Sequence, residues 1–282
     1  MAETAFMIQY RQEFIAAFEQ HQSLLRESVT TEAVIKGNQA TFLVAGSGGA
    51  TAKTRGVNGL IPARGDDLSQ PVATLVEWHD LVRKTDFNIF ASQGNQRAIM
   101  QSTCMAVINR KIDSDIVTEL NTGTINTGAA AAATLNLCLE AKTRLGQADV
   151  PWDSNVTFLA TPHFEATMLT LAAFTSRDFT SNGPIDGTPE AWRDRQQSYR
   201  WLGMNWIVHP QLPGEGTADA QCFAYHKNAI GHAYNSDNIE ARAGYDEEQD
   251  YSWSRCTIYM GSQVLQNSGI VVVNAIDNTL LA

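Results

Sequence analysis

The segment from Gly46 to Gly65 places the strongest constraint on how this chain can fold. It reads GSGGATAKTRGVNGLIPARG, with six glycines among its 20 residues. The runs on either side, 33–45 and 71–82, are rich in β-branched and apolar residues, and the second alternates with the period of a strand. Glycine tolerates positive φ, and a loop of this length inside a compact domain is usually functional. The pattern therefore predicts a long β-hairpin whose loop serves either as the lid of an enzyme or as an arm that reaches a neighbouring copy.

Charge is unevenly distributed along the chain. The net charge is −10, but the only charged residues of the loop are the cations Lys53, Arg55 and Arg64. The rest of the chain therefore carries 17 basic and 30 acidic residues, or −13, and a body this acidic repels nucleic acid. One segment is strongly acidic and contains Asp246, Glu247, Glu248 and Asp250. Opposite charges on separate surfaces are a feature that heterologous self-assembly can exploit.

Hydrophobic periodicity predicts several helices. An amphipathic helix over 4–28 is interpreted either as a docking arm or as an ordinary packed first helix. The most regular pattern runs from Ser92, a candidate cap, to Leu120, and a continuous helix from 93 to 120 is about 42 Å long. Its apolar stripe contains Met100, Cys104, Met105, Val107, Ile108, Ile112 and Ile116, and its polar face contains Arg97, Asn109, Arg110, Asp113 and Glu119. An alanine-rich helix is expected from Gly128 to Gly146, and another begins at Pro162.

Strand patterns occupy much of the second half of the chain. They are expected at 155–160, 201–208, 221–225, 254–260 and 268–275. The run of four apolar residues from Ile270 to Val273 indicates a strand that is buried on both faces. A short helix is expected at 228–234 and a surface loop at 175–198. The combination predicts an α+β protein, organised as one large domain or two small ones.

The sequence has no strong catalytic or metal-binding motif. Gly46-Ser47-Gly48 follows a strand, but Thr51 replaces the third glycine of a dinucleotide-binding loop. His163-Phe164-Glu165 lacks the second histidine of a zinc protease motif, and His226 and His232 have a weak metal spacing. The cysteines form no C-x-x-C pair and are expected to be buried small hydrophobes: Cys104, Cys138, Cys222 and Cys256. We therefore predict no enzymatic activity, no cofactor and no metal.

Neither a membrane nor a secretion signal is indicated. No apolar run approaches the roughly 20 residues of a membrane span, so no membrane partner is predicted. The start, MAETAFMIQY, lacks a basic region followed by an apolar core. The sequence is therefore expected to be that of a protein made and kept in a cytosol.

Four long stretches carry a family resemblance, together with the closing β-runs: FLVAGSGGATAKTRGVNGLIPARGDD, HDLVRKTDFNIFASQGNQRAIMQSTCMAVINRKID, YRWLGMNWIVHPQLPG and CFAYHKNAIGHA. In pattern and order they resemble the major capsid proteins of tailed bacteriophages. The resemblance implies the Hong Kong 97 fold. It would make 1–32 the N-terminal arm, 33–82 the extended loop (E-loop), 83–125 the peripheral domain with its long spine helix, 126–240 the axial domain, and 241–282 the strands that complete the sheets.

The resemblance implies a structural protein that assembles into an icosahedral head shell around phage DNA. Its expected partners are further copies of itself in hexamers and pentamers, with portal, scaffolding or decoration proteins, and its expected location is the virion, after assembly in the host cytoplasm. The charge pattern then predicts that Lys53, Arg55 or Arg64 contacts Asp246, Glu247, Glu248 or Asp250 of an adjacent subunit. An encapsulin-like nanocompartment shell and a soluble α/β enzyme with a lid loop remain the alternatives.

Overall fold

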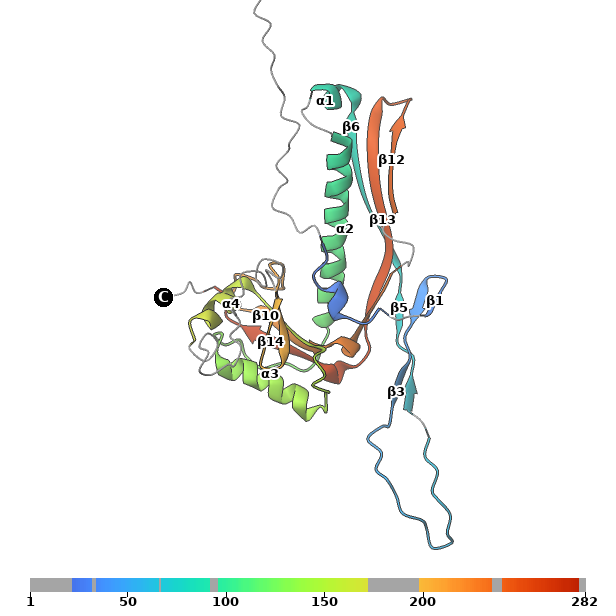
Figure 1. Cartoon of the computed structure of the whole chain (residues 1–282), viewed down its shortest axis with the longest axis vertical. Helices are drawn as coiled ribbons and strands as arrows, with labels where there is room; N and C mark the ends of the chain where they lie inside the picture. Colours follow the sequence, from blue (N-terminus) through green and yellow to red (C-terminus); the bar gives the residue numbers. More distant parts are fainter. Residues whose placement is uncertain are drawn as a thin grey trace, which may run out of the picture. The chain divides into compact units, whose positions relative to one another are not determined.

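The computed structural model describes residues 22–31, 34–65, 67–91, 96–171, 198–234 and 240–278 (Figure 1). The helices are α1 (Asp86–Ala91), α2 (Gln96–Leu120), α3 (Leu135–Gln147) and α4 (Pro162–Leu169), with 3₁₀ helices at Arg26–Ser28, Lys227–Ala229 and Asn267–Gly269. The strands are β1 (Val34–Lys36), β2 (Gln39–Thr41), β3 (Val44–Gly46), β4 (Asp67–Ser69), β5 (Val72–Thr74), β6 (Val76–Thr85), β7 (Val156–Ala160), β8 (Ser198–Trp201), β9 (Met204–Val208), β10 (Ala220–His226), β11 (Ile230–Tyr234), β12 (Glu240–Asp246), β13 (Tyr251–Val264) and β14 (Ile270–Ala275).

Three expected features fall partly or wholly outside the described residues. These are most of the helix over 4–28, the cap at Ser92 and the surface loop at 175–198. Of the first, the described part contains a single 3₁₀ turn, beside which Leu25 is fully buried. The described chain divides into two compact units, the first made of 22–23, 76–114 and 234–260, and the second of the remaining described residues.

The first unit is a helix packed on an antiparallel sheet. The central strand β13 pairs with β12 on one side and with β6 on the other, and Figure 1 shows α2 running alongside these strands. Along this part of β13 the even-numbered residues from Ser252 to Met260 are buried, whereas most of the odd-numbered ones are not, because successive side chains of a strand point to opposite faces. On the buried face the Sγ atom of Cys104 lies 3.6 Å from the carbonyl oxygen of Ser254.

The helix α2 confirms the strongest helical pattern of the sequence. At 25 residues it is about 37 Å long. One row of its buried residues recurs every four positions, at Met100, Cys104, Ile108, Ile112, Ile116 and Leu120, and Ala106 and Val117 are buried beside it. Two expectations for its faces are wrong: Val107 is exposed, and Asp113 is buried, where its carboxylate accepts a hydrogen bond from the Ser23 hydroxyl at 2.5 Å. Pairing with a residue 90 positions away stabilises a carboxylate that the local pattern assigns to solvent.

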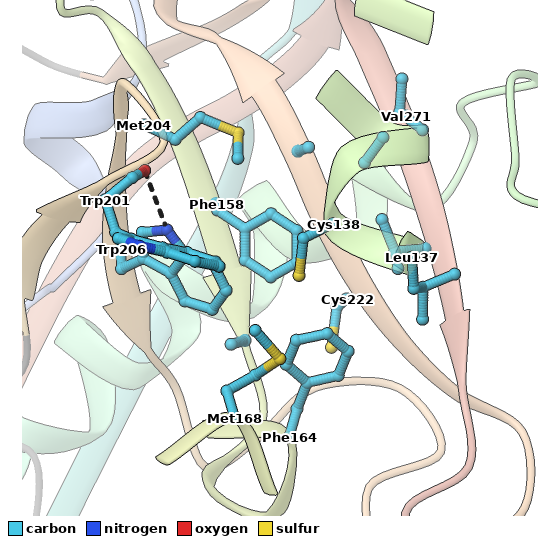
Figure 2. Packing of buried hydrophobic residues seen from close by; sticks show 14 of the residues in the cluster. Leu137, Cys138, Phe158, Phe164, Met168, Trp201, Met204, Trp206, Cys222 and Val271 are labelled. Atoms are coloured by element: carbon cyan, nitrogen blue, oxygen red, sulfur yellow. Dashed lines mark hydrogen bonds between the residues drawn. The ribbon is translucent and has the colours of Figure 1, made fainter. Parts of the chain in front are cut away.

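The second unit contains a five-stranded mixed sheet in the order β14-β10-β7-β9-β8. The pair β7 and β9 is parallel and the other pairs are antiparallel. The strand β14 is buried along Ile270–Val273, as predicted. The core of this unit is aromatic. The rings of Phe158 and Trp206 stack with centroids 4.2 Å apart, and the indole N–H of Trp206 donates to the Trp201 carbonyl oxygen at 3.3 Å (Figure 2). Stacking of this kind stabilises the core beyond the effect of the apolar area that the rings bury.

The single strand expected at 201–208 is instead a hairpin. Leu202 and Gly203, which join β8 to β9, both have positive φ, at 53° and 82°. Two consecutive positive φ values define a type I′ turn, whose twist matches that of an antiparallel pair.

The alanine-rich helix begins later than predicted. Thr134 is its N-cap and accepts a hydrogen bond from the Leu137 N–H, so α3 starts at Leu135 rather than near Gly128. The preceding residues are irregular, and two of them bridge in parallel to β14: Asn126 to Val272 and Ala131 to Ala275. Backbone pairing with a neighbouring strand outweighs the modest helix preference of alanine there.

The short helix expected at 228–234 is wrong for a similar reason. After one 3₁₀ turn the chain becomes β11, and a backbone bridge joins Gly231 to Thr30. Two backbone hydrogen bonds hold this extended form. The His232 N–H donates to the Thr30 carbonyl oxygen (2.8 Å), and the Thr30 N–H donates to the Ile230 carbonyl oxygen (3.1 Å). Thr30 is distant in sequence, so a local pattern cannot predict the pairing.

Candidate functional site

A hairpin is present around the predicted loop. Its root is the end at β2 and β5, its stem is formed by β3 and β4, and its loop lies between Gly46 and Asp67. The strands β2 and β5 pair near the root, and β3 and β4 pair farther along, ending with Gly46 opposite Asp67. Both expected runs are divided. At 33–45 a turn at Gly37 (φ 62°) returns β1 onto β2 as a further hairpin. At 71–82 only β5 pairs within the hairpin, whereas the residues from Val76 onward belong to β6 and pair with β13 instead. Beyond β3 and β4 the described loop contains neither helix nor strand and is drawn as an open trace (Figure 1).

The root is held by one buried aromatic side chain. Phe42 is 2% exposed and packs with Ala40, Ala73 and Ala233, whereas its neighbour Leu43 is 68% exposed. Gly231 lies directly against the ring: a Cβ atom built at this position would approach the ring carbons to 2.6 Å. A side chain at 231 would therefore overlap the ring, and glycine is the residue that admits Phe42.

The three loop cations have different environments. The guanidinium of Arg64 donates to the Ser47 carbonyl oxygen at 3.0 Å and closes the base of the loop on itself. Lys53 and Arg55 are exposed, and within the described part of the chain neither has a hydrogen-bond or ion-pair partner. These two cations are therefore the ones that the loop presents outward.

The tip of the loop is apolar, which the charge argument did not consider. Hydrogen bonds from Gly56 N to Leu60 O (3.0 Å) and from Gly59 N to Gly56 O (2.9 Å) close a tight turn. The turn holds Val57 and Leu60, 107% and 73% exposed, and Ile61 follows at 69%. Three large apolar side chains in one exposed turn suggest a surface that is buried in a complex. The sequence signal was the string VNGLI within a stretch of otherwise small and polar residues.

The acidic segment forms the turn between β12 and β13. The Asp246 carboxylate accepts hydrogen bonds from the backbone N–H groups of Gln249 and Glu248, at 3.1 and 3.0 Å, and chiefly the first of these holds its pKa below the usual value. The Tyr245 hydroxyl donates to Asp250 at 2.6 Å, and this bond raises the pKa of Tyr245 to about 12. Two of the four predicted acids therefore shape the turn, and Glu247 and Glu248 remain exposed at its tip. The predicted contact joins the loop of one subunit to this turn of another, and it stays a prediction.

The other candidate residues have structural partners. Among the described residues, no group of three or more His, Cys, Asp or Glu side chains is arranged to hold a metal ion. His226 Nε2 lies 3.0 Å from Asp153, and His232 Nδ1 lies 2.9 Å from the Ser262 hydroxyl. His163 and Glu165 open α4 behind the N-cap Thr161, as the helix prediction requires.

All four cysteines are buried free thiols, as predicted. Burial raises the pKa of Cys104 and of Cys222 to about 12 in each case, and it raises the pKa of Cys138 and Cys256 as well. A buried neutral thiol is a poor nucleophile, so these side chains act as small apolar residues. None of the described helices is both long enough and apolar enough to cross a membrane.

Solved structures share this fold. The structure of Mycobacterium phage Che8 matches with a TM-score of 0.72 and 16% identity, covering 96% of this chain and 98% of that chain. The capsid of a native GTA particle matches with a TM-score of 0.70 and 12% identity, over 98% and 97% of the two chains. The capsid asymmetric unit of cyanophage Pam1 matches with a TM-score of 0.69 and 11% identity, over 99% of each chain. At these identities the likeness shows the fold alone.

Sequence comparison is decisive for the family. A search of curated proteins gave no match. A family model described as phage capsid protein, however, matches residues 2–277, which is nearly the whole chain. The chain therefore belongs to the phage capsid protein family and is a major capsid protein, a structural component of a bacteriophage virion.

Proposed function

We propose that copies of this chain assemble, as hexamers and pentamers, into a closed icosahedral shell that encloses phage DNA. The observation that carries the proposal is the family match over residues 2–277, joined to a hairpin whose loop is exposed in the single chain. Such a hairpin can contact a neighbouring subunit at a surface different from its own, and heterologous contacts of this kind can close into rings and shells. Subunit assembly is mechanical work and requires no enzymatic activity.

The parts of the fold take the roles that the capsid resemblance implies. Residues 33–82 serve as the E-loop and lie over the peripheral domain of a neighbouring subunit. The helix α2 serves as the spine helix of the peripheral domain within 83–125, and the five-stranded sheet with α3 and α4 belongs to the axial domain within 126–240. Residues 1–32 serve as the N-terminal arm, and 241–282 return strands to the sheets. The support is the packing of α2 on β6 and β13 and the separate aromatic core around Phe158.

Apolar burial supplies most of the stability of the shell, and charge pairs guide the contacts. An exposed ion pair contributes about 0–1 kcal/mol, whereas burying one Val, Leu or Ile side chain contributes about 1.5–3 kcal/mol. The cations Lys53 and Arg55, with Arg64 at the base of the loop, approach the acidic turn of an adjacent subunit at Asp246, Glu247, Glu248 and Asp250. The support for this contact is the exposure of Lys53, Arg55, Glu247 and Glu248.

The partners and location follow from the same proposal. The shell encloses DNA without reading its sequence, and the acidic balance outside the loop keeps packaged DNA from adhering to the wall. Portal, scaffolding and decoration proteins are further partners, no membrane is involved, and assembly takes place in the host cytoplasm. The family match favours neither the nanocompartment shell nor the lid-bearing enzyme.

Electron microscopy of the purified chain tests the proposal. Closed shells are expected, and particles that never exceed a small oligomer would contradict it. Nucleic acid in particles from infected cells distinguishes a phage head from a nanocompartment, which would contain cargo protein instead.

A charge-neutral loop tests the guiding contact. The variant K53Q/R55Q should assemble less completely than the wild type at low salt, and the difference should shrink as salt screens the interaction. T54S is the matched control, since it changes the same exposed stretch without a change of charge. Equal yields and equal salt responses for both variants would refute the charged contact.

A further inference from the structure

The first unit contains a small apolar pocket that no other part of the described unit fills. It has a volume of about 260 Å³ and is lined by Met100, Ala243, Gly244, Tyr245, Trp253 and Ser254. Gly244 permits its shape, because a Cβ atom there would lie 2.7 Å from the ring of Trp253. Small-molecule sites usually measure about 300–1,000 Å³, so this pocket suits one or two inserted side chains better than a cofactor.

An acidic turn directly follows one of the pocket residues in the chain. Tyr245 lines the pocket and is followed directly by the turn that exposes Glu247 and Glu248. The Tyr245 hydroxyl is already bonded to Asp250, so the polar end of the side chain is satisfied and its ring remains available for apolar contact. An occupant of this surface needs an apolar anchor with positive charge beside it.

The hairpin loop has this composition. Its tip presents Val57, Leu60 and Ile61, which are the largest exposed apolar side chains of the loop. Lys53 and Arg55 precede the tip by four and two residues, and both are exposed. An apolar tip preceded by cations is thus complementary to an apolar pocket whose strand β12 leads into exposed carboxylates. A central apolar anchor with a charged rim is the usual arrangement of a specific protein contact.

We propose that the tip of the hairpin of one subunit inserts Val57 into the pocket formed by Met100, Tyr245 and Trp253 of a second copy. This inference rests on the proposed shell function and adds the receiving site, which the charge pattern alone did not locate. Leu60 and Ile61 cover the pocket mouth, and Lys53 and Arg55 lie against Glu247 and Glu248. The anchor supplies the apolar burial, and the charges set the orientation.

Site-specific crosslinking in assembled shells tests the insertion. The variant V57C/A243C places one thiol on the tip and one on the pocket wall, and the native cysteines are buried. A short bismaleimide crosslinker should join neighbouring subunits of these shells into a ladder of covalent multimers on a denaturing gel. V57C/Q101C is the matched control, because Gln101 is exposed on α2 next to Met100 but does not line the pocket. Each single-cysteine variant should remain monomeric on the gel.

The outcomes separate this inference from the proposed function. Shells of V57C/A243C that give no ladder, or a ladder no stronger than that of V57C/Q101C, would overturn the insertion while leaving shell assembly intact. Failure of the wild-type chain to form shells would instead refute the proposed function.

Two further variants keep the test decisive if the double variant does not assemble. V57S removes the apolar anchor, and A243L fills the pocket. Each should lower the assembled fraction at least ten-fold at a fixed subunit concentration, with the thermal midpoint of the free subunit unchanged. A63S, another exposed loop position, is the control and should assemble as the wild type does. Wild-type assembly by both V57S and A243L would overturn the proposal.

Discussion

The root of the hairpin depends on Phe42, and replacing it by alanine should destabilise the subunit severely. The Phe42 side chain is 2% exposed and packs in a small cluster with three alanines. A phenylalanine buries about 150–250 Å², which at about 25 cal/mol per Å² corresponds to roughly 4–6 kcal/mol. Direct measurements of Phe→Ala in protein cores give about 3–5 kcal/mol, and we expect F42A to lie in that range.

Gly231 allows this reasoning to be tested as a coupling. The variant G231A forces a methyl group to within 2.6 Å of the Phe42 ring and should cost about 1–3 kcal/mol through overpacking. In the background of F42A the ring is absent, so the same methyl group enters the vacated space. The double variant should therefore be more stable than the sum of the single effects predicts, by about 1 kcal/mol or more.

Denaturant unfolding of the unassembled subunit, followed by circular dichroism, measures all four corners of this cycle. L43A is the matched control, because Leu43 is adjacent in sequence but 68% exposed and should change stability by no more than about 0.5 kcal/mol. Strictly additive effects of F42A and G231A, or an F42A variant as stable as L43A, would show that the hairpin is not held in this way.

Other contacts give predictions that need only the free subunit. Asp277 is a buried carboxylate that accepts hydrogen bonds from the Thr161 hydroxyl (3.0 Å) and the Gly216 N–H (3.1 Å). The variant D277A should therefore lower the free energy of unfolding by about 2–4 kcal/mol in a denaturant titration. A loss below about 0.5 kcal/mol would show that these bonds are not formed. The pKa of Tyr245 is raised to about 12 by its bond to Asp250, so the stability that the bond confers is present below the ordinary tyrosine pKa near 10 and is lost as the pH rises toward 12. An ultraviolet pH titration should accordingly show one tyrosine ionising earlier in D250N than in the wild type, and identical titration curves would contradict the bond.

The strands and helices that follow from the sequence are those whose partners do not alter the local pattern. The stripe of α2 recurs every four residues from Met100 to Leu120, and β14 is buried on both faces as its run of four apolar residues predicts. The hairpin around Gly46 is predictable in part, because clustered glycines mark its loop and apolar runs flank it, but the second run continues past β5 into β6, which pairs with β13. In each case the signal lies within the segment itself.

The errors arise where a distant segment supplies the backbone or side-chain partner. Ala131 lies outside the predicted helix because it pairs with β14, and β11 replaces a predicted helix because Thr30 bonds to its backbone. Asp113 is buried because Ser23 meets its carboxylate. In each case the two partners are 90 residues or more apart in the chain. Local sequence patterns do not show which distant segments pair.

The loop residues were also only partly predictable from the sequence. The charge pattern identified Lys53, Arg55 and Arg64 as equivalent, but the geometry assigns Arg64 to the closure of the loop through Ser47 and leaves the other two exposed. The apolar side chains at the tip were visible in the sequence, yet only their exposure distinguishes an anchor from a buried residue. Since one buried aliphatic side chain outweighs one exposed ion pair, we expect the apolar tip to have the larger effect on affinity and the cations to have the larger effect on the salt dependence of assembly. Measuring the two effects separately, with V57S and with K53Q/R55Q, therefore tests two different properties of the proposed contact.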